Sequence, residues 1–231
     1  MNNNIETYNR FVISYFPNSY FLKYKINDRK AFFNVLNKCI TLKKCLATLQ
    51  HITKGQEHLL DEIIYQFLSI LYIVPGNDDF QYFSIMRALI ENFLRLFLST
   101  QTEINVLKLK SRSYNYSKLK EEIKNTDGYN NNKNKLDIMF SNYGKFSQYI
   151  HDKGKLSKSY LAYLEQIRIS SPGISLTTKI NQLDQHKDFI KKVIYPALNA
   201  NTKTISTEEL AILERVLGER EYNCLPIFEH K

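Results

Sequence analysis

The sequence predicts an all-α fold, a bundle of amphipathic helices, and three features support this prediction. Glycine (7) and proline (5) are scarce among the 231 residues, which disfavours the many tight turns of an all-β protein. Apolar side chains recur at spacings of three and four, the period of a helix with one buried face. Hydrophobic residues form 43% of the chain, with 16 tyrosines and 14 phenylalanines, so the chain can bury a large core.

Residues 1–28 are predicted to form an aromatic N-terminal arm that packs on the main domain. Aromatic residues in this arm include Phe11, Tyr15, Phe16, Tyr20, Phe21 and Tyr24. Pro17 should break any helix in the arm, because proline has no amide hydrogen to donate. Asp28 is a suitable N-cap residue, so the first helix of the main domain should begin directly after it.

Residues 29–200 are expected to form the helical bundle. Its first three helices are predicted at residues 29–53, 56–74 and 79–99. Gly55 ends the first helix, and a turn at Pro75-Gly76-Asn77-Asp78 precedes the third, with Asp78 or Asp79 as its cap. The third helix is apolar nearly all round, so we expect it to be the central and most buried one.

The second half of the chain is expected to be less regular. Residues 101–132 should form a loose basic insertion, with a short helix at 117–123 and a polar loop at 127–132. Further helices are predicted at residues 133–151, 157–169 and 176–200, the last of them kinked or ended by Pro196. Residues 201–231 should form a small C-terminal helical extension. Its helix opens with the capping box Ser206-Thr207-Glu208-Glu209 and ends at Gly218, before a polar tail.

The formal net charge of +9 favours contact with the phosphates of nucleic acid. Residues 101–160 hold 12 lysines and arginines against six acidic residues, and tyrosines are interleaved with these cations. Charge beside stacking surface suits single-stranded nucleic acid. The predicted nucleic-acid-binding residues are Lys108, Lys110, Arg112, Lys118, Lys120, Lys153 and Lys155. Two alternatives stay open: a solvated lysine face whose charge reflects an AT-rich genome, or a contact surface for a partner protein.

The cysteines Cys39, Cys45 and Cys224 show no metal-binding spacing, which predicts free thiols in a reducing compartment. The N-terminus lacks the regions of a signal peptide, and the most apolar window, residues 63–74, is too short to span a bilayer. We therefore expect a soluble, cytoplasmic protein without a membrane contact or a cofactor. His58 and Glu62 share a helix face but match no zinc motif, so no metal site is predicted.

The segments most informative about chemistry are two predicted helices. In one, Arg87, Glu91 and Arg95 follow at intervals of four inside an otherwise apolar run. Burying charges is costly unless they are paired, so the stripe indicates a specific role. In the other, the segment Tyr143-Gly144-Lys145-Phe146-Ser147-Gln148-Tyr149-Ile150-His151 ends on a histidine. One hypothesis is an Arg/Glu/His cluster in or near the core. The other is a structural Arg87–Glu91 pair and a histidine favoured by the helix dipole.

These two segments resemble the HEPN superfamily of small helical-bundle proteins, over about residues 29–200. In several HEPN-like families a long helix carries an R-x-x-x-E pattern, here Arg87 to Glu91, and a later helix ends in Ser-x-x-x-His, here Ser147 to His151. The resemblance implies toxin–antitoxin or anti-phage defence systems, metal-independent RNA cleavage, and a homodimer or a subunit of a larger complex. The chain departs from the family's hallmark, an Arg four to six residues before the His, because the only cation there is Lys145.

The resemblance implies a catalytic set of Arg87, Glu91, Lys145 and His151. RNA cleavage by the 2′-hydroxyl needs an acid or base that titrates near neutrality, which His151 could supply. It also needs a cation on the phosphorane, which Arg87 or Lys145 could supply, with Glu91 orienting Arg87. The resemblance therefore implies an RNA-directed defence or toxin-type protein that could act as a metal-independent endoribonuclease. The alternatives are a non-catalytic subunit that binds nucleic acid or a partner protein, and a purely structural interaction protein.

Overall fold

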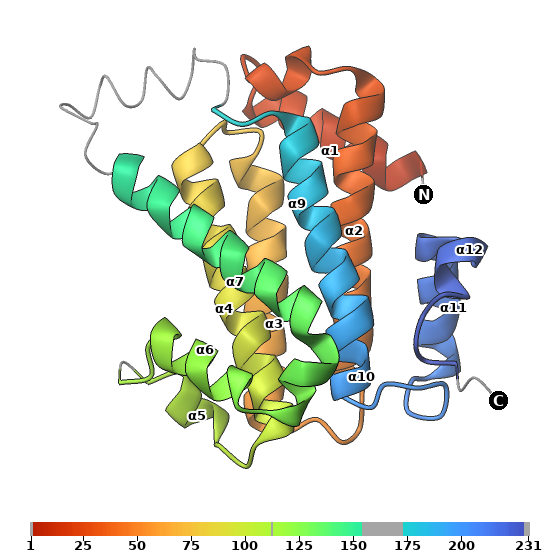
Figure 1. Ribbon diagram of the computed structural model, residues 1–231. Coiled ribbons are helices and arrows are strands. Elements are labelled where there is room, and N and C mark those ends of the chain that lie inside the picture. The colour runs from red at the N-terminus through yellow and green to blue at the C-terminus, as the bar shows by residue number, and fades with distance from the viewer. Residues whose placement is uncertain (1, 112, 154–172, 229–231) are drawn as a thin grey trace.

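The structure is a computed structural model that describes residues 2–111, 113–153 and 173–228. All regular elements within those ranges are helical, which confirms the all-α prediction (Figure 1). The longer helices are α1 (Asn2–Tyr15), α2 (Ile26–Ala47), α3 (Lys54–Ile73), α4 (Asp79–Gln101), α6 (Tyr116–Lys124), α7 (Asp127–Lys153), α9 (Leu176–Phe189) and α11 (Thr207–Leu217). Shorter elements are η1 (Tyr20–Lys23), α5 (Val106–Leu109), the π-helical turn η2 (Ile190–Ile194), α10 (Tyr195–Ala197) and α12 (Glu219–Tyr222).

The centre of the bundle is α4, as its all-round apolar sequence predicts. It packs against α3 and α7, while α2 packs against α3 and α9 (Figure 1). Leu89, Phe93 and Leu96 of α4 are fully or almost fully buried. The predicted start of α4 is confirmed, because the Asp78 carboxylate accepts a hydrogen bond from the amide of Gln81 (2.9 Å).

The start of α2 differs from the prediction at Asp28. The helix begins at Ile26, with Lys25 as the N-cap residue and no side-chain cap. Asp28 instead lies in the first turn, where its negative charge still complements the positive end of the helix dipole.

The N-terminal arm is more helical than its aromatic sequence suggests. Helix α1 covers 14 residues and ends two residues before Pro17, so the proline limits the helix without preventing it. The arm packs on the bundle as predicted. Val12 is fully buried, and the Tyr8 hydroxyl donates to the carbonyl of Leu71 (3.0 Å).

The predicted polar loop at 127–132 is wrong, because these residues form the first turns of α7. The Thr126 hydroxyl accepts a hydrogen bond from the amide of Tyr129 (3.1 Å) and so caps the new helix. Tyr129 is buried, which holds this turn on the bundle. The chain leaves helical geometry only at Asn132, where φ is −123° and α7 is kinked.

The basic insertion at 101–132 is packed rather than loose. Helices α5 and α6 lie within it, and Leu109, Leu119 and Ile123 are fully buried against the bundle. The predicted helix at 157–169 lies outside the described residues. The predicted helix at 176–200 is present as α9, η2 and α10 in succession and ends shortly after Pro196.

The C-terminal extension contains the predicted helix α11. The Ser206 hydroxyl accepts from the Glu209 amide (3.2 Å), and Gly218, with φ of +80°, ends the helix. The extension then turns into α12 instead of a polar tail, and Leu225 and Ile227 are buried. Helices α11 and α12 lie beside α2, on the side of the bundle away from α7 (Figure 1).

Among the helices of the described residues, none combines the length and the apolar character needed to cross a bilayer.

Candidate functional site

The charged stripe of α4 is half-buried, and its pairing differs from the sequence-based hypotheses. A guanidinium nitrogen of Arg95 lies 2.5 Å from a carboxylate oxygen of Glu91, the ideal spacing of one helical turn. No ion pair joins Glu91 to Arg87 in the part of the chain that the structure describes. Arg87 instead lies over the ring of Tyr143, 5.9 Å from its centroid. Glu91 therefore holds Arg95, and Arg87 is held by an aromatic ring of α7.

Two tyrosines continue the surface next to Arg87. The rings of Tyr116 (α6) and Tyr143 (α7) stack with centroids 3.4 Å apart and planes within 6°. Burial and the negative charge of Glu91 both raise the pKa of Tyr143, and burial also raises that of Tyr116. Both phenols therefore stay protonated and neutral at physiological pH. Each ring covers one face of the other, and the Tyr116 hydroxyl donates to the carbonyl of Phe140 (3.4 Å).

Lysines extend the same arrangement along α6. The ammonium of Lys118 lies 5.1 Å from the ring centroid of Tyr114, and that of Lys120 lies 5.3 Å from the ring centroid of Phe140. Each cation is thus close enough to an aromatic face for an attractive interaction. We call this set the cation–aromatic surface. Its exposed or half-buried members are Arg87, Tyr116, Lys118, Lys120 and Tyr143, and they lie over the buried rings of Tyr114 and Phe140.

Three of the remaining predicted nucleic-acid-binding residues lie within the described part of the chain. Lys108 is exposed on α5, whereas Lys110 is engaged by Glu62 of α3 at 2.5 Å. Lys153 is the last residue of α7. Arg112 and Lys155 lie outside the described residues. Of the predicted set, Lys108 of α5 and Lys118 and Lys120 of α6 form no ion pair with the described residues.

The other two predicted catalytic residues lie elsewhere on α7. Lys145 is exposed and borders a groove between α7 and α9. His151 is exposed near the C-terminal end of α7. Residues 143 and 151 are eight positions apart, which is about 12 Å along a helix axis. In this conformation, no contact among the described residues joins His151 to Arg87.

The pairing between the helices shows which way the histidine lies. Arg87 of α4 meets Tyr143, while Phe83, one turn earlier in α4, meets Phe146 and Tyr149. Helices α4 and α7 therefore run antiparallel, and His151 lies towards the beginning of α4. An Arg/Glu/His cluster in the core is not what this arrangement forms.

His58 and Glu62 of α3 share a helix face, but Glu62 is engaged by other groups. Glu62 accepts from Lys110 and, at 3.3 Å, from the side-chain amide of Asn92, and His58 lies 3.8 Å away. Within the described ranges, histidines, cysteines and carboxylates form no group of three or more that could hold a metal ion.

Sequence reasoning missed two polar features of α9 and the adjoining turn η2. His186 is fully buried, and Lys187 and Lys191 lie one turn apart and share a carboxylate from α12. The i, i+4 spacing of the lysines was visible in the sequence. Their partner Glu221 lies 30 or more residues further on, so the pattern could not identify it.

Comparison with protein-family models, with curated proteins and with solved structures finds no match for this chain.

Proposed function

We propose that this protein binds single-stranded RNA through the cation–aromatic surface of α4, α6 and α7. The observation that carries the proposal is the alternation of cations and rings, from Arg87 over Tyr143, through the Tyr143–Tyr116 stack, to Lys120 over Phe140. Cations attract the phosphates of a flexible strand, and the half-buried rings of Tyr116 and Tyr143 offer edges and faces on which unpaired bases can stack, while buried Phe140 supports Lys120 from below. Exposed Lys108 of α5 and Lys118 of α6 add positive charge.

The HEPN-like fold and the role in toxin–antitoxin or anti-phage defence belong to the same proposal. The packing of α4 against α7 supports them, because it places the helix with the Arg87-to-Glu91 pattern beside the helix with the Ser147-to-His151 pattern. The separation of Arg87 from His151 favours the binding subunit over the metal-independent endoribonuclease within that framework.

The test is binding of a fluorescein-labelled single-stranded 12-mer RNA, followed by anisotropy at fixed ionic strength. Reversing two lysines of the surface (Lys118→Glu with Lys120→Glu) should weaken binding by about tenfold or more, since each lost phosphate contact also weakens counterion release. Tyr143→Leu should weaken binding by about five- to one-hundred-fold, the range expected for one stacked base.

The matched control reverses two exposed lysines of α2, Lys30 and Lys44. It changes the net charge by the same amount on another helix, so it measures the non-specific part of the effect. Equal binding by the α6 variant and this control, together with unchanged binding by Tyr143→Leu, would overturn the proposal.

The same RNA incubated in EDTA decides between binding and cleavage. Cleavage that is lost in folded His151→Ala and Arg87→Ala variants would establish the ribonuclease. Intact RNA with every variant would leave the binding subunit as the function of this surface.

A further inference from the structure

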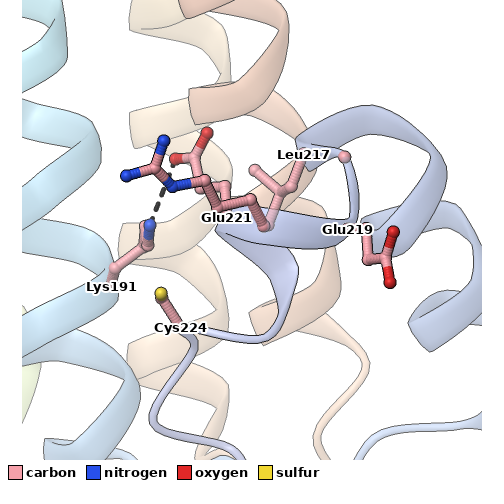
Figure 2. Close-up of a pocket in the computed structure, with 7 residues that line it drawn as sticks. Lys191, Leu217, Glu219, Glu221 and Cys224 are labelled. Carbon is pink, nitrogen blue, oxygen red and sulfur yellow. Dashed lines mark hydrogen bonds and ion pairs between the residues drawn. The ribbon is translucent and has the colours of Figure 1, made fainter.

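A second polar centre lies on the opposite side of the molecule, where three lysines converge on one carboxylate. Lys38 of α2 lies 2.6 Å from one oxygen of Glu221 in α12. Lys191 and Lys187 lie 3.1 Å and 3.3 Å from the other oxygen. Figure 2 shows Lys191 and Glu221 directed towards each other across the gap between the bundle and α12.

The lysines carry more charge than their partners neutralise. Lys187 also pairs with Asp184 at 2.5 Å, so three ammonium groups share two carboxylates. The side chains of Lys187 and Lys191 are only 12% and 8% exposed, so water screens them poorly. Burial alone would raise the pKa of Glu221, but the bond from Lys38 and the charges of Lys187 and Lys191 lower it to about 2. The position thus strongly favours an anion.

Glu221 belongs to a short helix with few packing contacts of its own. Helix α12 has four residues, none of them buried, and it follows directly on Gly218. The C-terminal extension packs on the bundle mainly through α11, which precedes α12, and through Leu225 and Ile227, which follow α12. An open groove of about 460 Å³ borders the centre. Its lining is Lys191, Leu217, Gly218, Glu219, Arg220, Glu221 and Cys224 (Figure 2).

We propose that Lys38, Lys187 and Lys191 form a binding site for a phosphate group, and that Glu221 occupies this site as an internal substitute. A phosphate dianion carries three or more acceptor oxygens and twice the charge of a carboxylate, so it matches three ammonium groups better. The groove beside Glu221 gives the ligand access, and Arg220 on its wall adds a further donor for phosphate oxygens. Binding would release α12 from α2 and α9.

The competing explanation is a structural latch, in which the lysines serve only to dock the C-terminal extension. The two differ in what happens when the carboxylate is neutralised. A latch loses stability without recovery, whereas an anion site with an empty position takes up phosphate.

The experiment compares wild type with Glu221→Gln by thermal unfolding, in inorganic phosphate and in chloride at equal ionic strength. In chloride, Glu221→Gln should unfold at a lower temperature than wild type. Phosphate should then raise the midpoint saturably, by about 3 °C or more at a concentration well above Kd. Wild type should respond less, because Glu221 competes with the ligand.

Two further variants make the result specific. Glu219→Gln removes the same charge from an exposed residue of the same groove and should show no enhanced phosphate response. Adding Lys191→Met to Glu221→Gln should abolish the response. Glycerol phosphate in place of inorganic phosphate distinguishes a phosphomonoester ligand from the free ion, and a saturable rise with either supports the site.

A phosphate response of Glu221→Gln no larger than that of Glu219→Gln would overturn the proposal. So would a response that survives Lys191→Met. If a variant is too unstable for melting curves, broadening of the ³¹P resonance by the folded protein at low temperature supplies the same comparison.

Discussion

Replacing His186 should make the protein more resistant to acid. This side chain is fully buried in α9 beside Phe93, with ring centroids 6.1 Å apart. Its Nδ1 lies 2.8 Å from the carbonyl oxygen of Gln182 and must donate, because a carbonyl only accepts. Nε2 is then a buried acceptor without a hydrogen-bond partner among the described residues. The imidazole is therefore held neutral.

The size of the stability loss in acid follows from the lowered pKa of His186. Burial lowers the pKa of His186 from 6.5 to about 4, against the opposing hydrogen bond to Gln182. Between pH 6.5 and pH 4 the unfolded chain binds a proton that the folded protein excludes, so stability falls as pH falls through this window. The loss between pH 7 and pH 5 is about 2 kcal/mol from this residue alone.

The assay is urea unfolding of wild type and His186→Leu at a series of pH values from 7 to 4.5. The carboxylates titrate in both proteins, so the difference between the two curves isolates the histidine. Between pH 7 and pH 5, wild type should lose about 2 kcal/mol more of its free energy of unfolding than His186→Leu loses. A control variant, His58→Leu, removes an imidazole whose side chain is 62% exposed. Parallel curves for wild type and His186→Leu would refute the reasoning.

Three other predictions concern stability and reactivity. Asp79→Asn should lower the free energy of unfolding, measured in urea, by about 3–5 kcal/mol. The reason is that the ammonium of Lys179, which is 3% exposed and 2.7 Å from Asp79, would lose its charge partner. A loss below about 1 kcal/mol would contradict this prediction. Gly55→Ala should cost about 1–3 kcal/mol in the same assay, since its added Cβ would lie 2.7 Å from a buried valine side chain. The matched variant Gly144→Ala, with no atom within 4 Å of its Cβ, should instead be neutral or stabilising by up to about 1 kcal/mol. Cys224, the exposed thiol, should react with a chromogenic disulfide in the native state, and the two buried cysteines only on unfolding; three equally fast thiols would contradict the described packing.

Local patterns in the sequence predicted a helix well where its apolar period and its N-cap residue indicated the same starting point. Helix α4 has both, an apolar run and Asp78 before it, and its start was predicted correctly. The polar loop at 127–132 was wrong because its asparagines suggest a turn, while Thr126 and buried Tyr129 supply a cap and an anchor that composition does not reveal. In that segment, tertiary packing outweighed local propensity.

The candidate site shows the same limit for side-chain partners. The structural alternative from the sequence paired Glu91 with Arg87, and this pairing was wrong, because two arginines stand at equal spacing, one turn before and one turn after Glu91. Which one pairs depends on Tyr143, 56 positions beyond Arg87 in the sequence, since the ring attracts Arg87 and leaves Arg95 to the carboxylate. Likewise, Lys38 and Glu221 are separated by 183 positions. Contacts of this kind follow from the assembled fold and have no local pattern.

The packing of α9 and α10 on α2 also has a consequence for how the chain is made. The hydroxyl of Tyr195 donates to the carbonyl of Leu42, and the two residues lie 153 positions apart. Translation proceeds at about 5–20 residues per second, so roughly 8–30 s separate the synthesis of α2 from the synthesis of the helices that cover one of its faces. Cys39 lies on that face, with its thiol directed to the carbonyl of Leu183. The nascent chain therefore presents an apolar, thiol-bearing helix to its surroundings until the last third of the protein emerges, and a chaperone that covers α2 would protect it at this stage.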